Sequence, residues 1–263
     1  MLRIDNIRKT FFPGTVNERI ALAGVSLTLD EGDFVTVIGS NGAGKSTLLN
    51  AISGKMPVDE GGIYIDEKNV RRLPDHGRAK YIGRVFQDPM AGTAPDLTIE
   101  QNLALAYTRG KTRGLSMGVT GKRRALFAEE LKKLELGLEN RLKARVGLLS
   151  GGQRQALSLL MASYTQPRIL LLDEHTAALD PQRADHVTRL TRDIVAESGL
   201  TTLMVTHNMQ QALDLGNRLI MMHEGRIILE LGPEEKAQRT VEDLLGEFAK
   251  IKGAQLDDRT LLQ

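Results

Sequence analysis

Residues 34–52 read FVTVIGSNGAGKSTLLNAI, and this stretch decides the fold. The first five residues are apolar or β-branched, which is typical of a strand buried on both faces of a parallel sheet. A glycine-rich loop follows. Beyond Lys45, three apolar residues recur on one side of a predicted helix, namely Leu48, Leu49 and Ile52. The order of strand, glycine loop and helix predicts an α/β domain with a functional loop at the carboxyl end of a strand.

The loop GSNGAGKS (39–46) matches the pattern G-x-x-x-x-G-K-[ST] without a gap. Glycines allow backbone N–H groups to come close to a triphosphate, and the start of the next helix adds the positive end of its dipole. Lys45 would supply charge for the β and γ phosphates, and the Ser46 hydroxyl would coordinate Mg²⁺. The predicted nucleotide-binding loop comprises Gly39, Ser40, Asn41, Gly42, Ala43, Gly44, Lys45, Ser46 and Thr47.

Two acids follow a second apolar strand in RILLLDEH (168–175). Ligands of parallel α/β sheets lie beyond the carboxyl ends of the strands. We therefore expect Asp173 to hold the Mg²⁺ shell and Glu174 to polarise the attacking water. The alternative is an acid pair that complements a helix dipole, and the phosphate loop favours the functional interpretation.

Two further polar residues end predicted strands. His207 ends TTLMVTH (201–207) and could donate a hydrogen bond to the γ phosphate, and Gln87 follows YIGRVF (81–86) and could sense metal or water. A lone histidine is more often a surface residue, and a glutamine at a strand end means little by itself. Their shared position at the carboxyl edge is what makes them candidates for the site.

LSGGQ (149–153) opens an apolar-periodic helix. Ser150 and Gln153 are spaced as a capping box, which is a complete structural explanation for those two residues. It leaves Gly151 and Gly152 unexplained, because each would cost up to about 1 kcal/mol relative to alanine in the first turn. Bare N–H groups at a helix start can bind an anion, so the chain carries two predicted phosphate-binding helix starts.

Composition sets the remaining limits. The 263 residues are 41% hydrophobic, with a formal charge of +2 and no cysteine, which fits a globular domain without disulfides and gives no indication of nucleic-acid binding.

Three segments outside the motifs have patterns of their own. From position 88 to about 161 the apolar residues recur at helical spacing. Residues 109–124 hold six basic and no acidic residues, which predicts a solvated loop, with contact to lipid or an acidic partner as the alternative. In the tail, Thr240 and Asp243 fit a capping box followed by an apolar stripe of Val241, Leu244, Leu245 and Phe248.

The ordered set GSNGAGKST, Gln87, LSGGQ, ILLLDE, AALD and His207 resembles the nucleotide-binding subunit of an ABC transporter over residues 39–207. The resemblance implies an α/β fold: a P-loop NTPase core with a parallel sheet, an N-terminal antiparallel β subdomain and an inserted α-helical subdomain. We expect a single ABC ATPase domain over 1–263. Its core would be 1–87 and 162–232, its helical subdomain 88–161 and its helical tail 233–263.

The resemblance also implies roles across a head-to-tail dimer. Ser150, Gly151, Gly152 and Gln153 would bind the γ phosphate of ATP held by the other copy, and Asp180 in AALD would communicate between copies. Glu174 would be the catalytic base, His207 the switch histidine and Gln87 the link to the membrane partner.

An aromatic side chain near the N-terminus usually stacks on adenine in this family. We expect Phe11 to do so, with Phe12 as the competitor and one of the two in the core. His175 stands where the family commonly has proline, so it would either change the turn or add a titratable group near the γ phosphate.

The implied cofactors are ATP and Mg²⁺. The implied partners are a second copy of the chain, an integral membrane permease and, for an importer, an extracytoplasmic solute-binding protein. The chain itself would lie at the cytoplasmic face of the inner membrane as a peripheral subunit. FFPGTVNE, GTAPDLTIEQNL and DEHTAALD are similar to a bacterial uptake subgroup linked to aromatic amino acids. A soluble ABC-type ATPase of translation or DNA maintenance, an exporter motor and a non-hydrolysing switch are the alternatives.

Overall fold

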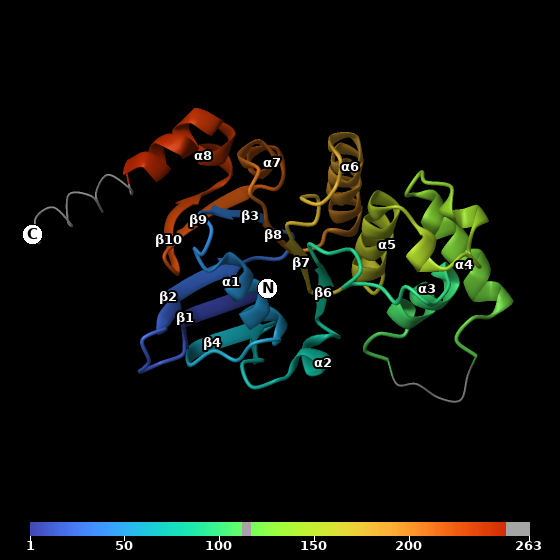
Figure 1. Cartoon of the computed structure of the whole chain (residues 1–263), viewed down its shortest axis with the longest axis horizontal. Helices are drawn as coiled ribbons and strands as arrows, with labels where there is room; N and C mark the ends of the chain where they lie inside the picture. The colour runs from blue at the N-terminus through green and yellow to red at the C-terminus, as the bar shows by residue number, and fades with distance from the viewer. Residues whose placement is uncertain (112–116, 251–263) are drawn as a thin grey trace, which may run out of the picture.

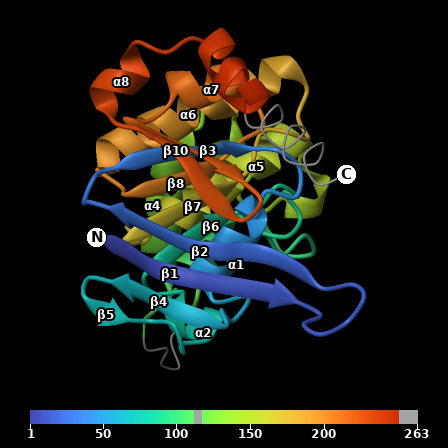
Figure 2. The same cartoon turned by 90° about the vertical axis from the view of Figure 1, so that its left-hand side faces the viewer.

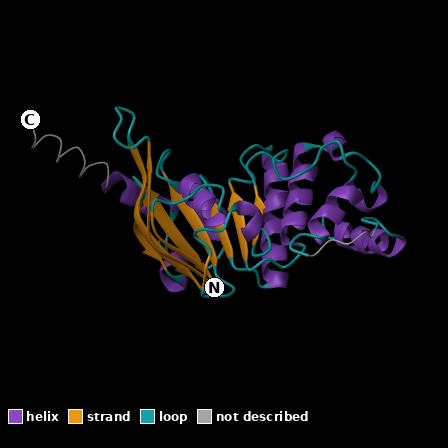
Figure 3. Cartoon of the chain, turned by 90° about the horizontal axis from the view of Figure 1, so that it is seen from below, coloured by secondary structure: helices purple, strands orange, loops and turns teal. Residues whose placement is uncertain are grey.

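The computed structural model describes residues 1–111 and 117–250. The two sheets lie on one side of the molecule, and the helices of residues 99–163 lie on the other (Figures 1 and 3). The larger sheet has six strands in the order β10-β9-β3-β8-β7-β6, and the smaller has four in the order β2-β1-β4-β5. The predicted combination of a parallel sheet, an antiparallel sheet and a helical region is confirmed.

The six-stranded sheet forms the centre of the molecule. Its parallel strands are β3 (Phe34–Gly39), β6 (Ile82–Val85), β7 (Ile169–Asp173), β8 (Thr202–Val205) and β9 (Arg218–His223). β10 (Arg226–Leu231) pairs antiparallel with β9 in a hairpin that turns at Glu224–Gly225. All four residues of β8 are buried, and so are the first four of β7, as expected for strands covered on both faces.

The four-stranded sheet is antiparallel and covers one side of the core (Figure 2). Its strands are β1 (Leu2–Phe11), β2 (Arg19–Leu29), β4 (Glu60–Ile65) and β5 (Lys68–Asn69). Helix α1 (Lys45–Ser53) packs between the two sheets, and its Leu48, Leu49 and Ile52 are fully buried in a cluster that includes both. The predicted apolar face of this helix is confirmed, and the cluster fixes the loop that precedes it.

A second cluster covers the opposite face of the parallel sheet. The helices that contribute to it are α3 (Ile99–Tyr107), α4 (Gly121–Lys132), α5 (Gly151–Ser163) and α6 (Pro181–Ser198), with the 3₁₀ turns η1 (Leu138–Asn140) and η2 (Val146–Leu148). Tyr107, Phe127 and Tyr164 meet edge to face, with ring centroids 5.8–6.3 Å apart. The helical region therefore shares one core with the parallel sheet; the domain boundaries stay predictions.

The basic segment 109–124 differs from the predicted solvated loop in its described parts. Arg109 is partly buried and donates to the Ala162 carbonyl at 2.7 Å. Arg124 lies in α4 and forms an ion pair with Glu100 at 2.6 Å. The Arg124 side chain is 43% exposed, so the interpretation as solvated charge is wrong for Arg109 alone. The prediction for residues 112–116 lies outside the described residues.

The C-terminal elements pack on β9 and β10. After α8 (Pro233–Ala237), Thr240 and Asp243 form the predicted reciprocal cap, and residues 241–250 are helical. Leu244 is fully buried and Phe248 packs beside it, whereas Leu245 is 51% exposed, so its predicted place in the buried stripe is wrong. The tail beyond 250 lies outside the described residues. Within residues 1–111 and 117–250, no helix is long and apolar enough to cross a membrane.

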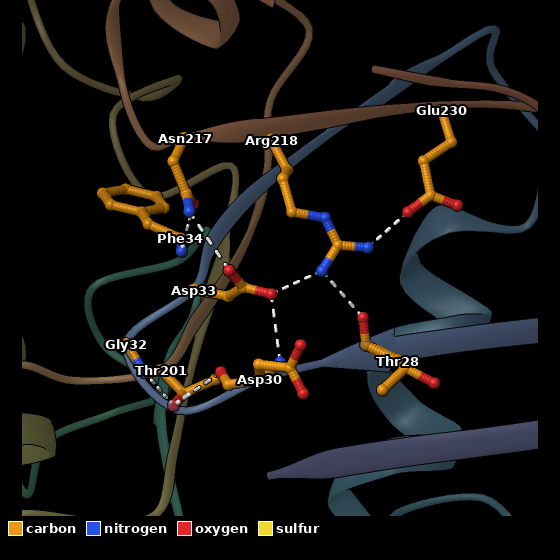
Figure 4. A network of polar contacts seen from close by, with 9 residues as sticks. All are labelled: Thr28, Asp30, Gly32, Asp33, Phe34, Thr201, Asn217, Arg218 and Glu230. Atoms are coloured by element: carbon orange, nitrogen blue, oxygen red, sulfur yellow. Dashed lines mark hydrogen bonds and ion pairs between the residues drawn. The ribbon is translucent and has the colours of Figure 1, made fainter. Parts of the chain in front are cut away.

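Two short helices complete the core, α2 (Asp75–Arg78) and α7 (Met209–Asp214). At the amino end of β3, a polar network joins the two sheets (Figure 4). Arg218 of β9 donates to the Thr28 carbonyl of β2 at 2.9 Å and forms ion pairs with Asp33 and with Glu230 of β10. Asp33 also accepts from Asn217 at 3.1 Å. Burial raises the pKa of Asp33, but these donors and the Asp30 amide lower it below its ordinary value overall.

Replacing Asp33 by asparagine will test this network. The variant loses charge-assisted bonds to Arg218, and we expect the free energy of unfolding in urea at pH 7 to fall by about 1–3 kcal/mol. Because the folded-state pKa is depressed, the difference from wild type will shrink as pH falls below about 4. Glu230→Gln changes a more exposed partner of the same arginine and is the matched control, with an expected loss of roughly 0.5 kcal/mol. Equal losses in the two variants would contradict the assignment.

Candidate nucleotide site

The glycine loop joins β3 to α1 in a turn that only glycine can form. A Cβ on Gly39 would lie 2.3 Å from the Met222 carbonyl oxygen, and a Cβ on Gly44 would lie 2.4 Å from that of Ala21. Gly44 also has a φ of 100°. Backbone contacts on both sides therefore fix the loop, with β9 against its start and β2 against its end.

Lys45 holds its charge inside this loop. Its Nζ donates to the carbonyl oxygens of Gly39 at 2.7 Å and Ser40 at 3.0 Å, and the residue is only 7% exposed. Burial lowers the pKa of Lys45, while Glu174 and Asp173 act in the opposite direction. The loop thus presents a cation that is bound only by neutral carbonyls, as an anionic ligand requires.

A cavity of about 360 Å³ opens above the loop. It is lined by Phe11, Arg19, Ala21, residues 41–47 and Glu174. Phe12 lies outside this lining and is 66% exposed, so the structure favours Phe11 over Phe12 as an aromatic wall, and the expectation that one of the two is core is wrong. Arg19 was not anticipated from the sequence. Its Nη2 donates to the Gly42 carbonyl at 3.2 Å.

Glu174, Gln87 and His207 meet at the carboxyl edge of the sheet. Gln87 donates from Nε2 to Glu174 Oε2 at 3.3 Å, and His207 Nδ1 lies 3.6 Å from the same oxygen. The three residues follow β7, β6 and β8, which are adjacent in the sheet. Glu174 adopts a φ of 44°, an uncommon value for a residue other than glycine. A carboxylate held between a donor and an imidazole is arranged to orient a water and to accept its proton.

Asp173 forms an ion pair that the sequence analysis missed. Its Oδ2 accepts from Arg84 Nη2 at 2.8 Å, and both side chains are largely buried. A charged residue inside the apolar run YIGRVF was the available signal. Within residues 1–111 and 117–250, no group of three or more His, Cys, Asp or Glu could hold a metal. The oxygens of Ser46 and Asp173 nevertheless fit Mg²⁺, which takes few protein ligands and completes its shell from phosphates and water.

The LSGGQ segment forms a separate half-site at the start of α5. Ser150 caps the helix, and Gln153 reaches back to the Ser150 amide at 3.2 Å in the predicted capping box. A Cβ on Gly152 would lie 3.1 Å from the Arg183 side chain, whereas Gly151 is exposed and meets only Leu179 at 3.5 Å. Among the residues that the structure describes, no contact therefore demands glycine at 151, which leaves room for an external ligand.

The structure does not bring all predicted residues together. Ser150 to Gln153 and Asp180 do not line the cavity around Lys45. Asp180 caps α6 through a bond from the Arg183 amide at 3.1 Å and forms an ion pair with the same arginine. Each of these residues remains a candidate only for a site completed by a second molecule.

His175 points away from the site. It is 2% exposed, and its Nε2 lies 2.8 Å from Thr191 Oγ1 of α6. Burial lowers its pKa to about 4. The imidazole is therefore neutral at pH 7 and packs the turn against α6. The alternative of a titratable group beside the γ phosphate is excluded by this geometry.

A glycine loop between a parallel strand and a helix, with acids at the end of β7 two positions along the same sheet, defines a P-loop nucleoside triphosphatase. The sequence profile of the family described as "ABC transporter" matches residues 22–177. The chain belongs to the ABC transporter family, in which it is an ATP-binding, ATP-hydrolysing domain.

Two curated relatives match nearly the whole chain. A "Tyrosine transport ATP-binding protein" of Clostridioides difficile is 45% identical over 253 residues, which cover 94% of this chain and 98% of the relative. A "Methionine import ATP-binding protein MetN" of Streptococcus agalactiae is 33% identical over 259 residues, covering 95% of this chain and 69% of the relative. Both are ATP-binding proteins of transport systems by name.

Solved structures agree with this assignment. A dimeric post-hydrolysis state of the ATP-binding cassette MJ0796, bound to ADP and Pi, has a TM-score of 0.76 and 34% identity over 89% of this chain and 99% of that one. A nucleotide-free cassette from an ABC transporter has a TM-score of 0.75 and 28% identity, over 94% and 95% of the chains. The predicted fold class is that of these cassettes.

His175→Gln will test the burial of this imidazole. Because its folded-state pKa is depressed, the wild type holds its full stability above about pH 6.5 and loses it as pH falls toward 4. Between pH 7 and 5 the wild type will lose about 2 kcal/mol more than the variant in urea unfolding. His76→Gln changes an exposed histidine and serves as control, and it will keep the wild-type pH dependence. If the stability of His175→Gln instead depends on pH as that of the wild type does, His175 is solvated.

Proposed function

We propose that the chain is the ATP-binding subunit of an ABC importer. Two copies would hydrolyse ATP at two head-to-tail interfaces and drive a small solute, such as an amino acid, through a separate membrane permease. The observation that carries this proposal is the separation of two phosphate-binding half-sites on one chain. The Lys45 loop forms one, and the Ser150 helix start, outside its cavity, forms the other.

A two-fold dimer is the simplest assembly that unites such half-sites. In a two-fold pair, a contact from one patch to another occurs twice, so two composite sites form together. The exposed Gly151 and the amides of the α5 first turn then face the γ phosphate of the ATP held by the other copy. The dimeric MJ0796 cassette supports this arrangement. Asp180 would carry the state of one site to the other.

Residues of the loop bind and orient the nucleotide. Phe11 would stack on adenine, backbone amides of residues 39–47 would wrap the phosphates, and Lys45 would exchange its carbonyl partners for the β and γ phosphates. Ser46 and Asp173 would hold Mg²⁺, which supplies Lewis-acid stabilisation of the phosphate charge.

Glu174 would activate the attacking water. Its carboxylate is held by Gln87 and lies beside His207, so it can accept a proton while the imidazole donates to the transferring phosphoryl group. Because ATP contacts both copies, its differential affinity for the closed dimer would drive closure, and hydrolysis would reopen it. Gln87 and the segment after it would pass this movement to the permease.

We infer the membrane partner and the cargo from the names of the relatives rather than from the geometry of the site. Methionine import and tyrosine transport by relatives favour uptake of an amino acid. An importer of this kind would place the chain at the cytoplasmic face of the inner membrane, with an extracytoplasmic solute-binding protein beyond the permease. Met90 and Leu148 are 41% and 74% exposed and offer apolar contacts for the permease. A soluble ABC-type ATPase and an exporter motor remain the competing functions.

Glu174→Gln will separate binding from hydrolysis. We expect the variant to bind ATP and accumulate as a dimer in size-exclusion chromatography, with the ATPase rate at least about 100-fold below wild type, because the base is lost. Lys45→Ala is the paired variant, and it will lose nucleotide affinity and stay monomeric. Brisk hydrolysis by Glu174→Gln would refute the assigned base, and an ATP-dependent dimer of Lys45→Ala would refute the loop.

Recovery of partners from native membranes tests the transport function. Tagged Glu174→Gln chain with ATP will co-purify a multispanning protein, identified by mass spectrometry, because the trapped dimer holds its docked state. Lys45→Ala, which loses nucleotide affinity, is treated identically, so that a complex that depends on bound nucleotide can be recognised by its loss in this variant. A co-purifying solute-binding protein would support import. Recovery of ribosomal or DNA-bound proteins, with the chain absent from membranes, would overturn the proposal in favour of a soluble ATPase.

A further inference from the structure

Arg84 is a largely buried cation in β6 that none of the assigned roles uses. One of its terminal nitrogens, Nη2, donates to Asp173 Oδ2 at 2.8 Å. The other, Nη1, donates to Asn50 Oδ1 at 2.8 Å and to Ser53 Oγ at 3.0 Å. Asn50 and Ser53 both lie in α1, the helix that begins with Lys45 and Ser46. A single guanidinium therefore links the proposed metal-binding acid to the phosphate-loop helix.

The guanidinium is held in one orientation. Its Cζ lies 4.8 Å from the centroid of the Phe86 ring, and its Nε is buried without a hydrogen-bond partner. A buried N–H without a hydrogen-bond partner costs free energy. The orientation of the guanidinium therefore satisfies the two terminal nitrogens and leaves Nε unpaired. The planar fork of arginine can make these separated contacts at once, whereas the ammonium of lysine is a point charge.

The contact constrains one oxygen of Asp173 and leaves the other untouched by Arg84. Asp173 is the last residue of β7, and its side chain is 13% exposed, so the ion pair with Arg84 is largely buried. Lys45 provides a second cation close enough to interact with the same acid. Asp173 is thus bound by Arg84 and also interacts electrostatically with Lys45 of the loop.

We propose that Arg84 is a positioning residue for Mg²⁺. It sets the rotamer of Asp173 and ties it to α1, so that the acid and Ser46 keep the separation that the ion requires. This inference rests on the proposed function, because it needs a Mg²⁺–nucleotide complex in the loop. Partners that orient metal-binding side chains typically change metal affinity by about 10- to 100-fold when they are removed.

Arg84→Met and Arg84→Lys test the proposal by nucleotide binding rather than turnover. A fluorescent non-hydrolysable ATP analogue is titrated in EDTA and again at increasing Mg²⁺. We expect binding in EDTA to stay within about two-fold of wild type, while half-saturating Mg²⁺ rises by about 10- to 100-fold. Electron paramagnetic resonance of Mn²⁺ with the same analogue will report the weaker binding of the metal ion directly.

Arg78→Lys is the matched control. Arg78 is also buried and donates to the Ala51 and Ile52 carbonyls of α1, both at 2.7 Å, but it does not bond Asp173. Its replacement will lower the melting temperature and leave half-saturating Mg²⁺ unchanged. If Arg84 served only to hold α1 in place, the two lysine variants would behave alike, and the proposal would fall.

Further outcomes are decisive. Unchanged Mg²⁺ dependence in folded Arg84 variants would overturn the inference, as would an equal loss of binding in EDTA. If neither Arg84 variant folds, Asn50→Ala decides by the same titration. This variant removes one α1 partner of Arg84 and keeps the charges of Arg84 and Asp173. We expect half-saturating Mg²⁺ to rise by less than in the Arg84 variants. Failure of the wild type to bind the Mg²⁺–nucleotide complex would instead refute the proposed function, so the two failures are distinguishable.

Discussion

The turn between β3 and α1 is the constraint on which the site depends. Its glycines lie within contact of the Met222 carbonyl in β9 and the Ala21 carbonyl in β2, so both sheets determine its path. The buried face of α1 then packs between those sheets. Because the loop is confined by backbone rather than by flexible side chains, its amides and Lys45 are already ordered before a ligand arrives. Pre-organisation of this kind reduces the entropy that binding would otherwise cost.

Parallel strand pairing brings together the polar residues that surround Glu174. β6, β7 and β8 are neighbours that run in the same direction, so the residues after them converge on one edge. Gln87, Glu174 and His207 meet there around a single carboxylate oxygen. Asp173, one residue earlier, is the last residue of β7 and engages Arg84. The two acids thus serve different partners, and the strand ends between them where Glu174 adopts a φ of 44°.

Each chain carries two candidate phosphate sites that lie apart, the Lys45 loop and the start of α5, and this separation relates the fold to the proposed assembly. The Lys45 cavity excludes Ser150 and Asp180, whose helices α5 and α6 pack against the other face of the sheet. In the proposed dimer a second molecule would unite the two. Nucleotide binding and association would then be one event, and a chemical step in one domain would become a movement of two.

The sequence by itself determined the elements whose signals are local. Spacing of glycines, apolar strands ending in polar residues and the S-x-x-Q cap each depend on neighbours along the chain, and they led to the loop, the acid pair, Gln87, His207 and the fold class. Only the tertiary structure decided the rest. Arg84 reaches Asp173 across 89 positions, Arg19 reaches Gly42 across 23, and His175 turns to Thr191. Side-chain direction and burial arise from packing between distant segments, which no periodicity in one sequence encodes.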